Sequence, residues 1–204
     1  DDGEIDITVT GGTSTYTYAW TTSDGFGLVV GDADQTGLTA GTYNVTATDQ
    51  NSCTISASYT ITEPAVLAIA KTITNVTCNG LNNGAIDTTV SGGTIGSGYT
   101  YAWTTSDGSG LVAADEDQTG LSPGSYTVLV TDANSCTVTD TYVITEPAVL
   151  AVSGVLSSHN GFNITCNGVN DGAIDTTVTG GTTAYTYAWT TSDGSGLVAA
   201  DEDQ

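Results

Sequence analysis

The sequence is almost devoid of basic residues. Lys71 is its only lysine or arginine and His159 its only histidine, against 23 aspartates and glutamates in 204 residues, so the formal net charge is -22. Binding to a nucleic-acid backbone requires clustered Lys and Arg that displace counterions, which excludes nucleic acid as a partner. An anionic membrane surface would repel the chain for the same reason.

Long apolar runs are also missing. No stretch approaches the roughly 18 apolar residues that cross a bilayer, so membrane insertion is not expected. The N-terminus carries no signal peptide, and we therefore expect the chain to be an interior piece of something longer.

The residues that catalysis needs are scarce. With one histidine and no arginine, the chain assembles neither a Ser-His-Asp triad nor a phosphate clamp. A carboxylate pair of the glycosidase type remains available, but an active site copied into every repeat would be unusual. We therefore predict that the protein is not an enzyme.

What the sequence has in abundance is threonine and glycine, with 40 and 26 residues. Threonine has a branched Cβ that suits a pleated strand, and its hydroxyl keeps an outer face hydrated. Glycine supplies the turns between strands. This composition predicts an all-β protein without helices.

The chain consists of tandem repeats. Its three tryptophans, Trp20, Trp103 and Trp189, stand in register 83 and 86 residues apart, and the segment 101–118 recurs unchanged as 187–204. Periods of this length can close a core of their own. The predicted repeats are 1–64, 65–147 and 148–204. The first lacks its beginning and the third its second half, so neighbouring chain or another subunit is expected to complete them.

Each repeat is predicted to be a β-sandwich of about seven short strands. Rings alternate with small residues at Tyr16, Tyr18 and Trp20, which is the period-two pattern of a half-buried strand. Tyr43 stands at the start of a late strand just after a tight corner, as in a tyrosine corner, and the third strand carries a tryptophan. Both features favour tandem immunoglobulin-like β-sandwich repeats. Asp140 breaks the alternation, and a bulge or an exposed strand end is expected there.

A series of motifs resembles a known family along the whole chain. In the middle repeat the motifs are Cys-Asn-Gly at 78–80, Asn-Gly-Ala-Ile-Asp at 83–87, Gly-Gly-Thr at 92–94, Tyr-Thr-Tyr-Ala-Trp at 99–103, Gly-Leu-Ser-Pro-Gly-Ser-Tyr at 120–126, Thr-Asp-Ala-Asn-Ser-Cys at 131–136 and Thr-Glu-Pro at 145–147. The series is similar to the SprB-type repeat of gliding-motility adhesins and related giant surface proteins of Bacteroidetes. The resemblance implies type IX secretion, display on the surface of a Gram-negative cell, and a role in adhesion or gliding.

Four cysteines in an exported chain suggest disulfide bonds. The simplest pairing is one bridge per repeat, Cys78 to Cys136, with Cys53 and Cys166 paired outside this window. Immunoglobulin topology places Cys78 and Cys136 at opposite ends of a sandwich, about 23 Å apart, whereas a bridge tolerates about 7 Å between Cα atoms. A bridge between successive repeats is the alternative.

Two kinds of further site are candidates. Acidic clusters recur in every repeat and are either Ca²⁺ sites or solvated anionic loops that keep a crowded polymer soluble. They are Asp32 and Asp34; Asp115, Glu116 and Asp117; and Asp201, Glu202 and Asp203. Asp-Thr-Thr resembles the O-glycosylation motif of Bacteroidetes, which makes Thr88 and Thr176 candidates, although Thr88 occupies an inward position.

These observations predict an extracellular structural protein that forms a stalk or filament for surface adhesion or gliding. Its expected partners are other copies or neighbouring repeats of the same chain. The alternative is a multivalent adhesin module that binds surface glycans through exposed tyrosines and loops without forming regular fibres. Apart from Ca²⁺, no cofactor is expected.

Overall fold

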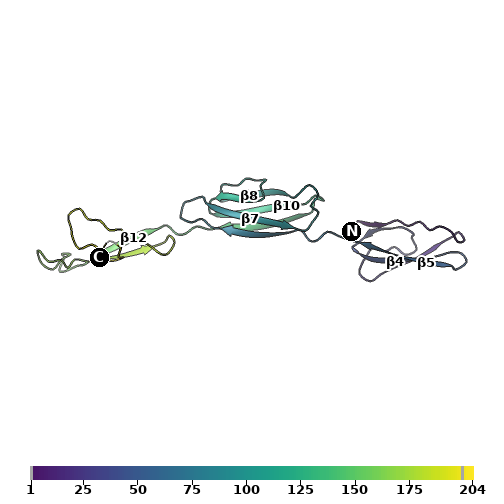
Figure 1. Ribbon diagram of the computed structural model, residues 1–204, viewed down its shortest axis with the longest axis horizontal. Helices are drawn as coiled ribbons and strands as arrows, with labels where there is room; N and C mark the ends of the chain where they lie inside the picture. Colours follow the sequence, from purple (N-terminus) through teal and green to yellow (C-terminus); the bar gives the residue numbers. More distant parts are fainter. Residues whose placement is uncertain (1, 199) are drawn as a thin grey trace. The chain divides into compact units, whose positions relative to one another are not determined.

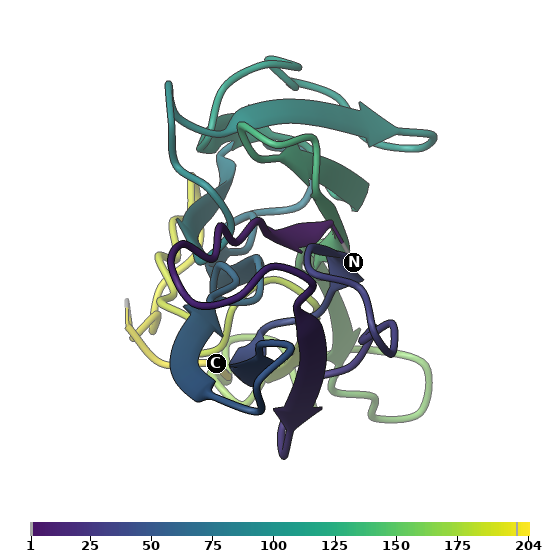
Figure 2. The same cartoon turned by 90° about the vertical axis from the view of Figure 1, so that its right-hand side faces the viewer.

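The computed structural model describes residues 2–198 and 200–204. These residues form thirteen β-strands and no helix. The ribbon shows arrows and loops without a coiled segment (Figure 1 and Figure 2). The all-β prediction is therefore confirmed. The described part of the chain accordingly has no helix long and apolar enough to span a membrane. By its internal contacts the chain divides into two compact units, Asp1–Ala65 and Val66–Gln204.

Residues 66–147 form two three-stranded antiparallel sheets. The strands are β6 (Ala68–Thr74), β7 (Gly84–Ser91), β8 (Thr100–Thr105), β9 (Gln118–Leu121), β10 (Gly124–Thr131) and β11 (Thr137–Ile144). One sheet has the order β6-β7-β9 and the other the order β11-β10-β8, and labels in Figure 1 mark β7, β8 and β10. Both edges of each sheet are therefore open to pairing unless a loop covers them.

The two sheets share one core. On β10, alternate residues Tyr126, Val128 and Val130 are fully buried, as the period-two pattern requires. They pack with Ile86 from the first sheet and with Trp103, which is 3% exposed. At about 25 cal/mol for each Å² of apolar surface removed from water, such a cluster is the main stabilising term of the repeat.

The strand order can be compared with that of an immunoglobulin domain. A constant-type domain pairs strands A-B-E-D against C-F-G. In 66–147 the six strands correspond to A-B-E and C-F-G, and the segment between β8 and β9, where strand D would run, is a loop. The predicted number of about seven strands is thus too high by one. The immunoglobulin-like classification itself stays an interpretation.

The unit Asp1–Ala65 contains five strands. They are β1 (Gly3–Ile5), β2 (Thr17–Thr22), β3 (Gln35–Leu38), β4 (Gly41–Thr48) and β5 (Thr54–Ile61). β1 pairs with β3, and the second sheet has the order β2-β4-β5. The core is smaller, with only Ile5, Leu38 and Tyr43 in its buried cluster. Within this unit no strand occupies the position that β6 takes beside β7.

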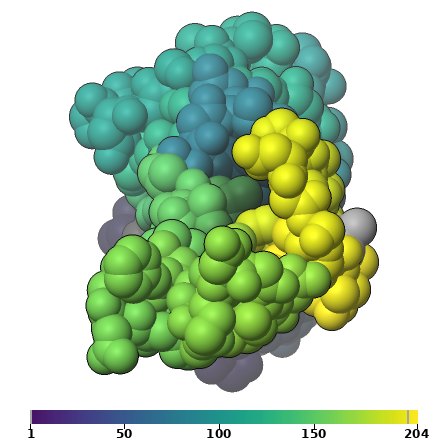
Figure 3. Space-filling view, turned by 90° about the vertical axis from the view of Figure 1, so that its left-hand side faces the viewer, coloured from purple at the N-terminus to yellow at the C-terminus, as the bar shows by residue number. Residues whose placement is uncertain are grey.

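The segment 148–204 contains two strands, β12 (Ala151–Leu156) and β13 (Ile174–Thr179), which pair with each other. Every residue of β12 is exposed. Among the described residues of this segment no hydrophobic side chain is buried. Gln204 exchanges backbone hydrogen bonds with Ile174, the first residue of β13, so the last residues of the segment lie beside that strand. Figure 3 shows the earlier part of the segment (green) and its last residues (yellow) in one view.

A tyrosine corner closes the loop before β10, as the sequence predicted. The Tyr126 hydroxyl donates to the carbonyl of Ser122, four residues upstream, at 2.7 Å and lies 3.0 Å from the Ser109 carbonyl. A Cβ on Gly108 would collide with this hydroxyl, which explains why glycine is required there. Tyr43 makes the matching bond to the Thr39 carbonyl at 2.8 Å.

The expectation of a bulge or an exposed strand end at Asp140 is wrong. Asp140 lies in the middle of β11, and the β10–β11 ladder runs from Gly124 to Thr131 without a register shift. The carboxylate is paired with Lys71 of β6 at 3.0 Å, and Lys71 Nζ lies 4.4 Å from the centre of the Tyr142 ring. Lys71, the only lysine or arginine of the sequence, thus links β6 at the edge of one sheet to β11 at the edge of the other.

Candidate functional site

The acidic loop between β8 and β9 is tied to the core by its backbone and by one carboxylate. Trp103 Nε1 donates to the carbonyl of Asp115 at 2.8 Å, and the Thr88 amide donates to Asp117 Oδ1 at 2.9 Å. The loop therefore satisfies two polar groups that burial would otherwise leave unpaired.

A buried glutamine that the sequence analysis missed organises the same loop. Gln118 is 1% exposed. Its Oε1 accepts from the Val112 amide at 2.8 Å, and its Nε2 donates to the carbonyls of Val112 at 2.9 Å and Asp115 at 3.1 Å. The Gln118 side chain thus makes hydrogen bonds to the loop backbone of the kind that a neighbouring strand would make. The recurrence of Asp-Gln at 34–35, 117–118 and 203–204 was the available signal.

The same contacts recur in the other two repeats. Trp20 Nε1 donates to the Asp32 carbonyl at 3.0 Å, and Trp189 Nε1 to the Asp201 carbonyl at 2.9 Å. Asp34 accepts from the Ile7 amide and Asp203 from the Thr176 amide. The repeated acidic motif therefore serves the internal hydrogen bonding of each repeat.

The predicted Ca²⁺ sites require several carboxylates to lie close together. Ca²⁺ takes six to eight oxygen ligands. In the residues that the structure describes, no three acidic, His or Cys side chains form a group that could hold a metal ion. Asp117 Oδ1 is already used by the Thr88 amide. Ca²⁺ at Asp115, Glu116 and Asp117 and at the matching clusters stays a prediction.

The candidate glycosylation sites lie inside the repeats. Thr88 is 4% and Thr176 8% exposed. Their hydroxyls donate to the carbonyls of Glu116 at 2.9 Å and Glu202 at 2.6 Å. A folded repeat therefore offers neither hydroxyl to a modifying enzyme.

The structure does not bring Cys78 and Cys136 together. All four cysteines are free and exposed. Cys136 directly precedes β11, whereas the turn that follows Cys78 lies beyond the other end of that strand, because the Gly80 amide donates to Glu146 at 2.7 Å. Eight strand residues separate the two ends by about 23 Å. The bridge between successive repeats stays the alternative prediction.

The hairpin before β11 is held by an aspartate. The Asp132 carboxylate accepts from the backbone amides of Thr94 at 2.8 Å, Asn134 at 2.9 Å and Cys136 at 2.8 Å. The amide of Thr94, followed by those of Cys136 and Asn134, outweighs burial and lowers the pKa of Asp132 below its usual value. Asp49 occupies the same position before β5, and its pKa is lowered in the same way, mainly by the Thr13 amide.

The aromatic rings that a sugar would stack on are turned inward in the middle repeat. Trp103 is buried and packs against Tyr142 with ring centroids 5.7 Å apart. Tyr99 and Tyr101 are partly buried against the same core. Burial, together with Glu116 nearby, raises the pKa of Tyr101 above its usual value.

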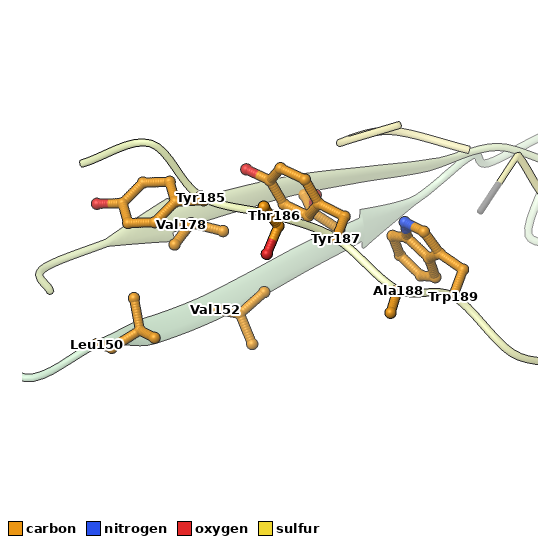
Figure 4. A pocket seen from close by; sticks show the side chains of 9 residues that line it. Leu150, Val152, Val178, Tyr185, Thr186, Tyr187, Ala188 and Trp189 are labelled. Atoms are coloured by element: carbon orange, nitrogen blue, oxygen red, sulfur yellow. The ribbon is translucent and has the colours of Figure 1, made fainter. Parts of the chain in front are cut away.

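The matching rings of the third repeat line an open groove of about 570 Å³. Figure 4 shows Leu150 and Val152 on one side of the groove and the extended segment with Tyr185, Tyr187 and Trp189 on the other. In the middle repeat the equivalent space holds side chains of β10 and β11. The groove is thus lined by residues whose counterparts in the middle repeat face the core.

Comparison with known proteins bears on what these repeats are. The family model of the SprB repeat matches residues 1–25, 70–108 and 162–194, one segment in each predicted repeat. The resemblance predicted from the motifs is confirmed by these matches. A search of the curated proteins found no match to the chain.

Proposed function

The chain carries SprB repeats in three segments, and on this premise we propose that it is part of the stalk or filament of a cell-surface adhesin. SprB repeats are a structural repeat type of cell-surface proteins, which supports an extracellular location and a role without catalysis. Export by the type IX route and display on a Gram-negative surface belong to the same proposal.

The observation that carries the proposal is the internal use of the repeated polar groups. In every repeat the tryptophan, the acidic motif and the following glutamine bind one another or the backbone. If each repeat carried a ligand-binding site, the polar groups common to the repeats would point outward, toward the ligand. The groups that these repeats share instead hold a loop against the core, as expected of a structural scaffold.

Net charge supports the same role. A chain with a net charge of -22 repels its own segments and other copies at low salt, which keeps a crowded surface polymer extended and soluble. The effect decays within a Debye length of about 8 Å at physiological ionic strength, so it acts between neighbouring repeats.

The alternative is a multivalent module that binds surface glycans, for which weak sites would add avidity. The partly exposed rings of Tyr185 and Tyr187 in the open groove favour it locally. A glycan array probed with the purified chain, together with electron microscopy of the chain with and without a reducing agent and EGTA, separates the two. The stalk proposal predicts no specific glycan signal and extended particles. Glycan binding that Tyr187→Ala abolishes would favour the module and overturn the stalk.

A further inference from the structure

The segment that enters repeat two and the segment that leaves it are bonded to each other. Val76, which follows β6, donates its backbone amide to the carbonyl of Thr145, which follows β11, at 3.0 Å. The Thr145 amide in turn donates to Asn75 Oδ1 at 2.9 Å. Val76 is 3% exposed, so the donor of the backbone bond is shielded from water.

Further bonds extend this contact in both directions. Toward the C-terminus, the Gly80 amide donates to Glu146 Oε2 at 2.7 Å. Asn79 Nδ2 donates to the Pro147 carbonyl at 3.1 Å. Toward the N-terminus, the ion pair described above joins β6 to β11. From the ion pair to Pro147 the residue numbers rise on both sides, so the two segments run side by side in the same direction.

Tension on the chain loads these bonds in shear. A pull from the neighbouring repeats enters repeat two at the first residue of β6 and leaves it after Pro147, because the covalent chain runs that way. Two segments that run in the same direction and are pulled from opposite ends slide past each other, so their bonds are loaded together and not one at a time. Neither β6 nor β11 can leave its sheet along the pull until these bonds break.

We propose that the bonds between residues 71–80 and residues 140–147, which we name the clamp, set the force at which repeat two unfolds. The inference rests on the proposed stalk role, for which resistance to tension is the useful property. A hydrogen bond that water can replace contributes only modestly to equilibrium stability, whereas forced unfolding is governed by the unfolding rate. The clamp therefore protects the repeat against tension more than against denaturant.

The test is a single-molecule measurement on the full chain at constant force, in which the rate of the repeat-two unfolding step is recorded. Asn75→Ala combined with Glu146→Ala removes the acceptors of the Thr145 and Gly80 amides and should accelerate that step about 10-fold or more. Unfolding in urea shows that the variant folds and measures the stability it loses at equilibrium, so that rates can be compared between variants at equal loss.

Asn83→Ala is the matched control. Asn83 Oδ1 accepts from the Thr77 amide at 3.1 Å, and Asn83 Nδ2 donates to the Thr77 hydroxyl at 2.7 Å. The variant thus loses exposed hydrogen bonds of the same kind that do not cross to residues 140–147. Its step should keep the wild-type rate within about 2-fold, because these bonds are still formed when the clamp breaks. Asn75→Asp combined with Glu146→Gln keeps both acceptors and should keep the wild-type rate as well.

The outcomes separate the clamp from the stalk role. An unchanged rate after loss of both acceptors, or an equal acceleration by Asn83→Ala at equal loss of stability in urea, would overturn the clamp and leave the stalk role intact. A wild-type chain that extends without a discrete step for repeat two would overturn both.

Discussion

The tyrosine corner of repeat two permits a sharp test of what holds this repeat together. Tyr126→Phe removes one hydroxyl, which leaves the Ser122 carbonyl without its donor and the Ser109 amide without one of its two acceptors. Loss of a partner for a buried polar group costs about 1–3 kcal/mol. Since Ser109 is exposed and water can reach it, we expect about 1–2 kcal/mol. Each kcal/mol lowers the Tm of a domain of this size by about 4–8 °C.

Tyr142→Phe is the matched control, because among the described residues the Tyr142 hydroxyl has no hydrogen-bond partner and is buried. Burial and the nearby charge of Asp140 raise the pKa of Tyr142 to about 12, so the hydroxyl is neutral. Its removal leaves no group unpaired and should change the free energy of unfolding by less than about 0.5 kcal/mol.

The assay is urea unfolding followed by tryptophan fluorescence in a Trp20→Phe, Trp189→Phe background, in which only Trp103 reports. Trp103 lies in the core of repeat two, so the signal follows that repeat alone. Equal stability of Tyr126→Phe and its background, or an equal loss in both tyrosine variants, would refute the reasoning.

Further changes test other contacts of repeat two. The folded pKa of Asp132 lies below its ordinary value of 3.8, so the stabilisation by its carboxylate is present above pH 3.8 and is lost as the pH falls toward the lower folded pKa. Asp132→Asn should remove this acid dependence of the free energy of unfolding, measured from pH 7 to pH 2. The ion pair between Lys71 and Asp140 is about 40% exposed, so a double-mutant cycle should give only about 0.2–1 kcal/mol, decreasing in 1 M salt. Gln118→Ala removes three hydrogen bonds of a buried side chain and should lower the free energy of unfolding, measured in urea, by about 2–4 kcal/mol. A loss under about 1 kcal/mol would mean that the loop keeps its conformation without the glutamine.

The sequence was sufficient for the elements that depend on local pattern. Period-two alternation at Tyr16, Tyr18 and Trp20 predicts a strand, and β2 follows that pattern, with Tyr18 and Trp20 less exposed than their neighbours in the strand. The tyrosine corner follows from a short motif, and the repeats follow from identity within the chain. The SprB resemblance rests on a series of such motifs and is matched in all three repeats.

What the sequence did not reveal depends on contacts between distant residues. The pairing of Asp140 with Lys71 spans 69 positions, so alternation along one strand made Asp140 look like a defect. Gln118 was passed over because a buried glutamine is recognisable only from the loop that folds around it. The separation of Cys78 from Cys136 follows from the sheet topology, which the cysteine spacing does not contain.

Single-molecule force extension of the chain tests the central claim, that these repeats are structural units that carry load. Repeat two should unfold in one step and release about 25 nm of contour length, as roughly 80 residues at about 3.5 Å each require after subtraction of the folded length. Repeat one, with its smaller buried cluster, and the segment 148–204, in which no described hydrophobic side chain is buried, should yield at lower force. Extension without a discrete step for repeat two would contradict the account, because a segment that yields gradually has no cooperative core with which to form a stalk.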